Sequence, residues 1–188
     1  TALYTVFVQN LVLSSGLGMS EAIRVSTKPG MFGKFAAMIS GFSVVTSVLC
    51  SLIDNIPVMA DVTYAIRAAV YGGILAAVFL IVVIAARFIF KASNEFLGTL
   101  GIAALNTLVL AVPYINHSAA YSFADSIGSG IGAGIAFVLA AALISTGSRI
   151  LAENKNIPEI FKGTPTMFLY VAMISLAFVG FSDTNLFA

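Results

Sequence analysis

The few charged residues of this 188-residue chain lie in short gaps between long apolar runs, and this spacing constrains the fold more than any other feature. Only 9% of the residues are charged, whereas 60% are hydrophobic. Four charge-free runs are long enough to cross a bilayer as a helix, namely residues 35–53, 68–86, 126–148 and 163–182. Two more uncharged runs, 1–20 and 96–124, are interrupted by Gly, Ser, Asn or Pro. The sequence therefore predicts an all-α integral membrane protein with six transmembrane helices, the first and fourth interrupted.

The basic residues divide unevenly between the gaps. Eight of the nine Lys and Arg residues fall in the first, third and fifth connections: Arg24, Lys28, Lys34, Arg87, Lys91, Arg149, Lys155 and Lys162. Only Arg67 falls on the other side. Because short loops rich in Lys and Arg are retained in the cytoplasm, we expect these three connections to face inward and both termini to face outward.

The chain is expected to form one membrane domain, residues 1–188, built from two inverted halves of about 1–92 and 93–188. Three helices followed by three more place the halves in opposite orientations. The first helix of each half carries a similar interrupted stretch, Asn10-Leu-Val-Leu-Ser14 and Asn106-Thr-Leu-Val-Leu110. Paired interrupted segments at matching positions indicate a functional site near the bilayer midplane.

These interrupted helices supply the candidate residues of an ion or electron path, which are Asn10, Ser14, Ser15, Asn106 and Thr107. Irregular backbone at membrane depth is tolerated only inside protein or along a wet cavity, so both helices are expected in the interior. The alternative, which stays open, is that the two asparagines only hydrogen-bond across packed helices.

Proline and glycine occur within the apolar runs of the second half. Pro113 removes a backbone donor, so the fourth helix is expected to kink or end there.

The fifth helix opens with four glycines at alternate positions, Gly128, Gly130, Gly132 and Gly134. They form two interleaved small-xxx-small pairs, which favour close helix packing. A phosphate-binding loop is excluded because no strand precedes them and no Lys follows them.

Other function classes lack the residues they require. No cluster of basic and aromatic residues indicates nucleic-acid binding. His117 is the only histidine and is expected to be a solvated loop residue. Asp54, Asp61 and Asp125 are expected at the outer ends of helices; an ion-relay role stays open for Asp54 and Asp125, although the interfacial position favours simple solvation. The single cysteine, Cys50, is expected to pack as a small apolar side chain.

Short motifs along most of the chain resemble one family. The second half has Ser-Phe-Ala-Asp125, Gly147 with Arg149, Ile157-Pro158, Lys162-Gly163 and the ending Ser175-Leu-Ala-Phe-Val-Gly-Phe-Ser182, and the first half has Asn10-Leu-Val-Leu13, Gly18 and Val25-Ser26. With these motifs the chain resembles the RnfA and NqrE subunits of the Rnf and sodium-pumping NADH:quinone oxidoreductase complexes. The expected orientation also separates it from the related RnfE and NqrD subunits, which the family pattern places the other way.

The resemblance implies a multi-pass subunit in a bacterial or archaeal cytoplasmic membrane, within a complex that couples electron flow to sodium or proton translocation. In that family two inverted subunits pair, and each supplies two cysteines, one from each broken helix, to a 2Fe-2S cluster. Further subunits carry flavin and iron-sulfur centres. In this chain Ser20 and Thr107 occupy the two cysteine positions. Hydroxyl groups do not replace thiolate in such a cluster, so we expect this chain alone to bind no cofactor.

The expected function is therefore a non-catalytic subunit that pairs with an inverted RnfE- or NqrD-like subunit, contacts lipid, and supplies scaffold and part of an ion or electron path. Three explanations of the missing cysteines stay open: a divergent complex with another electron carrier, a paralogue kept as scaffold and ion path, or a family member that has left redox chemistry. The alternative function is an independent small inverted-repeat transporter or channel for ions or a small solute.

Overall fold

The computed structural model describes residues 1–59 and 62–182, and within these ranges the chain is helical. The α-helices are α1 (Ala2–Phe7), α2 (Leu11–Ser15), α3 (Met19–Ser26), α4 (Phe32–Asp54), α5 (Tyr64–Phe88), α6 (Asn94–Ala104), α7 (Thr107–Ser118), α8 (Phe123–Glu153) and α9 (Thr164–Ser182). Three short 3-10 helices, η1 (Pro29–Met31), η2 (Pro57–Met59) and η3 (Glu159–Phe161), lie in the connections. The all-helical prediction is confirmed.

The described helices include four that are long and apolar enough to cross a membrane: Pro29–Asp54, Tyr64–Phe88, Asn94–Ser118 and Phe123–Glu153. A fifth candidate is the N-terminal segment, in which Ala2–Ser15 and Met19–Ser26 are bent by 96° at the break between them. The C-terminal helix is also apolar but shorter, Thr164–Gly180. Four or five candidate spans are thus present; the count of six and the inverted repeat remain predictions.

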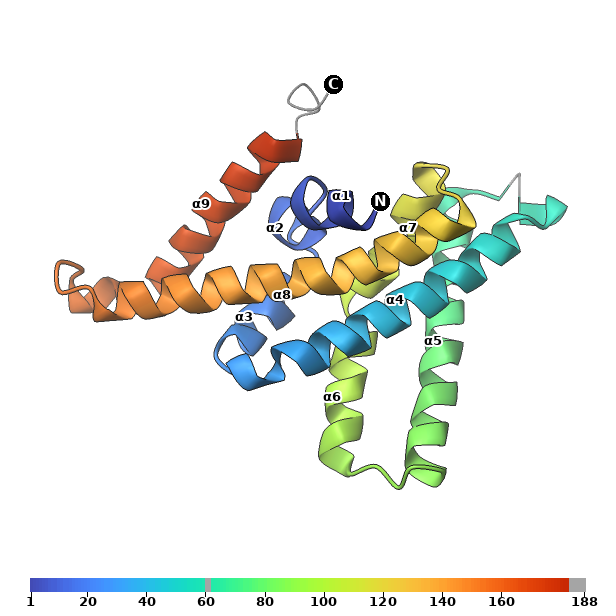
Figure 1. The fold of residues 1–188 in the computed structure, drawn as a ribbon, viewed down its shortest axis with the longest axis horizontal. Helices are drawn as coiled ribbons and strands as arrows, with labels where there is room; N and C mark the ends of the chain where they lie inside the picture. The colour runs from blue at the N-terminus through green and yellow to red at the C-terminus, as the bar shows by residue number, and fades with distance from the viewer. Residues whose placement is uncertain (60–61, 183–188) are drawn as a thin grey trace.

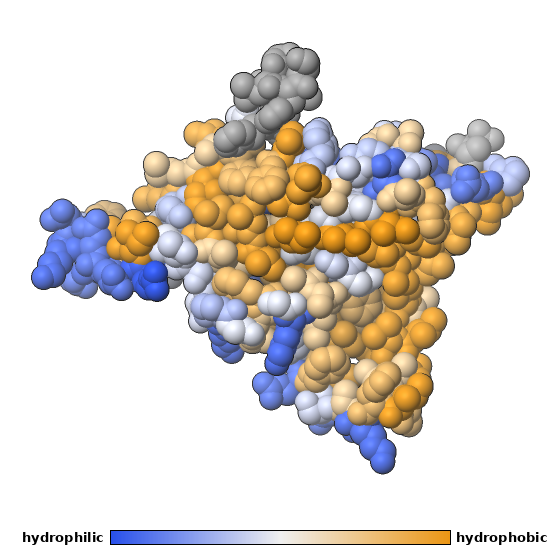
Figure 2. Space-filling model, in the orientation of Figure 1, coloured by the Kyte–Doolittle hydropathy of each residue, from blue (hydrophilic) through white to orange (hydrophobic). Residues whose placement is uncertain are grey.

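The helices are arranged around the pair formed by α4 and α8. In Figure 1, α8 runs the width of the molecule with α4 beside it, while α5 and α6 project together and α9 leaves the far end of α8. Short helices α1, α2 and α3 pack against the same long helix α8. Hydrophilic residues gather at helix ends, around the α8–α9 and α5–α6 connections, and a broad hydrophobic surface lies between these ends (Figure 2).

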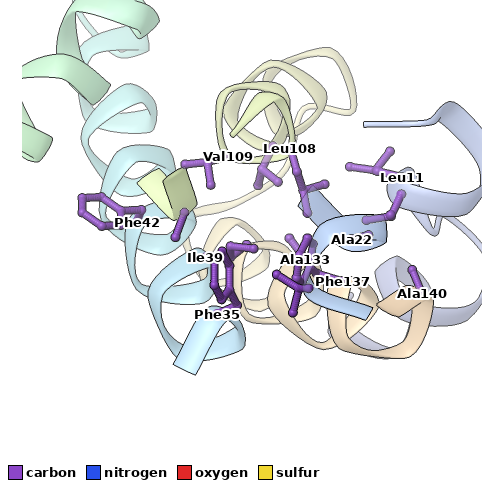
Figure 3. Packing of buried hydrophobic residues seen from close by; sticks show 14 of the residues in the cluster. Leu11, Ala22, Phe35, Ile39, Phe42, Leu108, Val109, Ala133, Phe137 and Ala140 are labelled. Atoms are coloured by element: carbon purple, nitrogen blue, oxygen red, sulfur yellow. The ribbon is translucent and has the colours of Figure 1, made fainter. Parts of the chain in front are cut away.

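The core lies where α4, α7 and α8 meet. Figure 3 shows Phe35 and Ile39 of α4 close to Phe137 of α8, with Leu108 of α7 above them. The rings of Phe35 and Phe137 are stacked, with centroids 6.1 Å apart and planes inclined by 15°. These side chains are almost fully buried. Most of α5 is exposed by contrast, as expected for a surface that meets lipid or other subunits.

The glycine packing predicted for the fifth span is present in α8. A Cβ atom at Gly130 would lie 2.7 Å from Val44 Cγ2, and one at Gly134 would lie 2.7 Å from the carbonyl oxygen of Ala36, so this pair packs on α4. A Cβ atom at Gly132 would lie 2.8 Å from the carbonyl oxygen of Ala2 in α1. The interleaved glycines thus give α8 two close-packing faces, one for each neighbour.

Candidate functional site

The N-terminal span is broken where the sequence has its glycines. Helix α2 ends at Gly16 and α3 begins after Gly18, and both glycines adopt a left-handed backbone conformation, with φ of 70° and 74°. Residues with a side chain rarely adopt these angles, so the two glycines permit the sharp bend between α2 and α3. The predicted interruption of the first helix is confirmed.

The two asparagines singled out by the sequence have the same local role. Asn10 is the N-cap of α2, and its Oδ1 accepts a hydrogen bond from the backbone N–H of Leu13 at 3.2 Å. Asn106 is the N-cap of α7, and its Oδ1 accepts from the N–H of Leu108 at 2.9 Å. Both residues are almost fully buried. Each asparagine therefore restarts a helix inside the protein, where water does not satisfy the free N–H groups.

The fourth span is interrupted at Asn106, the first residue of its predicted interrupted stretch. Helix α6 ends at Ala104 and α7 begins after Asn106, so the break precedes Asn106. Helix α7 then continues through Pro113 to Ser118, so of the two outcomes expected at Pro113, a kink or an end, the helix does not end there. Proline removes only one hydrogen bond from a helix. The buried side chain of Asn106 instead accepts a hydrogen bond from a free backbone N–H group, so a new helix begins there.

The two breaks touch each other. The backbone N–H of Gly18 donates to Thr107 Oγ1 at 2.9 Å, across 89 residues of sequence. A Cβ atom at Gly18 would lie only 2.7 Å from Asn106 Oδ1, so only glycine permits this approach. The Nδ2 of Asn106 is buried and has no hydrogen-bond partner among the described residues. The structure thus brings Asn106 and Thr107 beside the break between α2 and α3.

The remaining predicted site residues lie at the edge of this contact. Ser14 donates through Oγ to the carbonyl oxygen of Asn10 at 2.7 Å, and Ser15 is exposed. Ser20 and Thr107 are also exposed, and Ser20 Oγ donates to Glu21 Oε2 at 2.6 Å. These hydroxyls hold protein hydrogen bonds and offer no thiolate.

The residues at the breaks do not fit an iron-sulfur cluster of the family type. Such clusters need soft sulfur ligands, and hydroxyls stand at both cysteine positions. Cys50 is buried one turn from the C-terminal end of α4, not at either break. No group of three His, Cys, Asp or Glu side chains in the described part of the chain is placed to hold a metal ion.

A second polar group, which the sequence reasoning missed, lies at the C-terminal ends of α4 and α7. Arg67 Nη1 donates to Asp54 Oδ1 at 2.6 Å, and Arg67 Nη2 donates to the carbonyl oxygen of Met59 at 2.8 Å. The hydroxyl of Tyr71 donates to Asp54 Oδ2. His117 Nδ1 lies 3.1 Å from Asp54 Oδ2 and 3.3 Å from Arg67 Nη1. The expectation of a solvated loop histidine is wrong, because α7 extends far enough to bring His117 into this group.

Asp125 lies on the surface of the protein. Asp125 is exposed in the first turn of α8, where its carboxylate accepts from Ser122 Oγ at 2.6 Å and from the Thr1 hydroxyl. Asp61 lies outside the described residues.

In the connection between α7 and α8, burial raises the pKa of Tyr121 above its ordinary value, and nearby Tyr4 and Asp125 act in the same direction.

Comparison with known proteins identifies relatives over nearly the whole chain. Residues 1–184 match the family model described as "Rnf-Nqr subunit, membrane protein". The chain is 31% identical to the A-type subunit of the Na(+)-translocating ferredoxin:NAD(+) oxidoreductase complex of Acetobacterium woodii, covering 96% of this chain and 94% of that protein. It is 28% identical to the E-type subunit of the Na(+)-translocating NADH-quinone reductase of Pseudoalteromonas translucida, over 96% and 95% of the two chains.

A third relative differs in the ion that its name states. The A-type subunit of the proton-translocating ferredoxin:NAD(+) oxidoreductase complex of Clostridium ljungdahlii is 34% identical, but over 42% of this chain and 40% of that protein. The relatives therefore include proteins named for sodium and proteins named for protons.

Proposed function

Since this chain belongs to the Rnf-Nqr family of membrane subunits, we propose that it serves as the A- or E-type subunit of an ion-translocating ferredoxin:NAD⁺ or NADH:quinone oxidoreductase complex. The observation that carries the proposal is the near-complete coverage of both chains by relatives of these two subunit types. The chain is a multi-pass membrane protein, and it contributes no reacting group of its own to the oxidoreductase reaction.

The proposed topology is six transmembrane segments in two inverted halves, with both termini outside. Three features support it. Each half begins with an interrupted span that contains a helix capped by a buried asparagine, Asn10 in α2 or Asn106 in α7. Each broken span precedes one long helix of the central pair, α4 or α8, and then one largely exposed helix, α5 or α9. Eight of the nine basic residues fall in or beside the α3–α4, α5–α6 and α8–α9 connections.

The proposed contribution of this chain is scaffold and part of the ion or electron path, without cluster ligands. The contact between Gly18 and Thr107 joins the two broken spans, and Ser20 and Thr107 are exposed beside it. An inverted RnfE- or NqrD-like subunit is the partner proposed to cover this surface. Flavin and iron-sulfur centres would be held by further subunits, and paired iron density at the two breaks with sulfur ligands from this chain would contradict the proposal.

A second candidate is an independent transporter built on the same fold. The observation in its favour is that Ser20 and Thr107 stand where the resemblance places the two cysteines. Co-purification separates the two functions. The chain, carrying an affinity tag, is extracted from membranes of its own organism in mild detergent, and its partners are identified by mass spectrometry. The proposal predicts an inverted membrane relative together with flavin- and iron-sulfur-containing subunits. A homodimer without redox subunits would contradict it and support the transporter.

A further inference from the structure

A small polar cavity lies apart from the two breaks, at the ends of α4 and α7 and the start of α8. Its volume is about 140 Å³, and its polar lining includes Ser47, Ser51, Asp54, Asn116, His117 and Ser126. At roughly 30 Å³ for each water molecule in the liquid, this volume accommodates about four or five waters.

The cavity contains buried polar atoms that the protein leaves unpaired. Ser47 Oγ, Ser126 Oγ and both amide atoms of Asn116 have no hydrogen-bond partner among the described residues. An unsatisfied buried polar group destabilises a protein. The three residues come from different helices, and all three line the cavity.

Further buried hydroxyl groups lie on α4 between the cavity and the middle of the helix. Ser43 Oγ and Thr46 Oγ1 are buried and also lack a partner among the described residues. With Ser47 and Asp54 they extend over eleven residues of helix, which corresponds to about 16 Å at 1.5 Å per residue. The buried hydroxyls therefore lie along α4 from its centre to its C-terminal end.

In the cavity wall, His117 Nδ1 lies within hydrogen-bond distance of one donor, on Arg67, and one acceptor, on Asp54. Neutral His117 with an unprotonated Nδ1 accepts from Arg67 Nη1 at 3.3 Å. Once Nδ1 carries a proton it donates instead to Asp54 Oδ2 at 3.1 Å. The other groups around it are Tyr71 on α5, hydrogen-bonded to Asp54, and Tyr121, which lines the cavity from the α7–α8 connection. Histidine is the side chain in this group whose ordinary charge change falls between pH 5 and 8.

We propose that this cavity is a water-filled proton port, in which His117 takes up a proton from the aqueous phase at one end of the molecule. Hydronium transfers its proton to Nδ1 and leaves as water, the imidazolium is stabilised by the Asp54 carboxylate, and release returns the proton to cavity water. Arg67 remains charged throughout and holds Asp54 in place. The role of the port in ion translocation rests on the proposed function. The water in the cavity and the protonation of His117 do not depend on that function.

Cysteine accessibility tests whether the cavity is wet. Cys50→Ala removes the only cysteine of the chain, and Ser47→Cys or Ser126→Cys then introduces one thiol into the cavity. The matched control is Leu52→Cys on the exposed apolar face of the same helix, α4. Intact cells are treated with a membrane-impermeant charged methanethiosulfonate reagent, which reacts with thiolate and therefore in water. We expect at least tenfold faster labelling at the two cavity positions than at the control, and equal rates would overturn the proposal.

The pH dependence of the assembled complex tests the role of His117. His117→Gln retains a side chain that hydrogen-bonds but does not charge, and the exposed Ser118→Ala is the matched control. In proteoliposomes we expect His117→Gln to remove a step in the pH profile of ion-coupled turnover, while Ser118→Ala keeps it. A His117→Gln complex with the unaltered pH profile would overturn the protonation of His117. A chain that joins no complex would refute the proposed function, and labelling of the cavity cysteines would still test the port.

Discussion

At the residue scale, Arg67 and Asp54 form an ion pair that is largely buried. The two side chains are 6% and 17% exposed, and Asp54 also accepts from Tyr71. Burial of two charges costs solvation energy, which this geometry offsets through short contacts and additional hydrogen bonds. Removal of one partner leaves the other charge uncompensated, so the pair is expected to be sensitive to single substitutions.

We predict that Arg67→Met lowers the free energy of unfolding by about 3 kcal/mol, at the lower end for a broken buried pair because Asp54 is partly exposed. The double variant Arg67→Met with Asp54→Asn should recover most of this loss, since no unpaired charge then remains. Denaturant unfolding in detergent micelles measures both. A single variant as stable as the unaltered chain would show that water already compensates Asp54.

The second residue-scale prediction concerns Asn106, which caps α7 at the contact between the breaks. Asn106→Ser keeps a capping oxygen, whereas Asn106→Leu removes the cap and the polar amide, at a cost of about 1 kcal/mol. If Asn106 lines the ion path, the Leu variant should assemble yet lose ion uptake per assembled complex, and the Ser variant should retain more of it. Uptake in proteoliposomes is compared with assembly in detergent. Normal uptake per complex from the Leu variant would leave Asn106 as a structural cap.

Sequence patterns identified some site residues and missed others for a physical reason. Asn10 and Asn106 could be predicted because each stands in a local pattern, a polar residue that interrupts an apolar run. The contacts of Arg67 with Asp54 and His117 join residues 13 and 50 positions apart. They depend on how α4, α5 and α7 pack, which no local pattern specifies.

At the element scale, the glycines of α8 determine how closely its neighbours approach. We predict that Gly134→Ala destabilises the chain by about 1–3 kcal/mol, because the added methyl group would overlap Ser40 and the carbonyl oxygen of Ala36 in α4. The matched control is Gly73→Ala in α5, where nothing lies within 4 Å of the added Cβ atom and alanine favours the helix. Thermal unfolding in detergent measures the difference, and equal effects of the two substitutions would refute the packing argument.

Hydropathy predicted the long helices well and their boundaries less well. Charge-free runs located α4, α5 and α8 because bilayer thickness imposes a minimum apolar length. Asn106 and Pro113 were both expected to interrupt the fourth span, and the helix begins anew at the buried cap Asn106 but continues through Pro113. A helix is interrupted where another group accepts the hydrogen bonds of its backbone N–H groups. The sequence does not show whether a capping side chain is buried.

At the scale of the whole molecule, the distribution of basic residues predicts which side of the membrane each connection faces. A reporter active only in the cytoplasm should work when inserted near Lys155, in the α8–α9 connection, and should fail when fused after residue 183. Activity is measured in intact cells, with expression of each fusion checked by immunoblot. The reverse pattern would contradict the proposed orientation and favour the related subunit type that is inserted the other way.

The central claim is that this chain is a working part of a redox-driven ion pump, and its most direct test compares the purified complex with and without the chain. Both preparations are reconstituted in proteoliposomes, and uptake of sodium and of protons is followed as the electron donor is oxidised. The account predicts ion uptake by the complete complex and its loss when the chain is absent, with restoration on re-expression. Undiminished uptake by a complex that lacks the chain would contradict the claim.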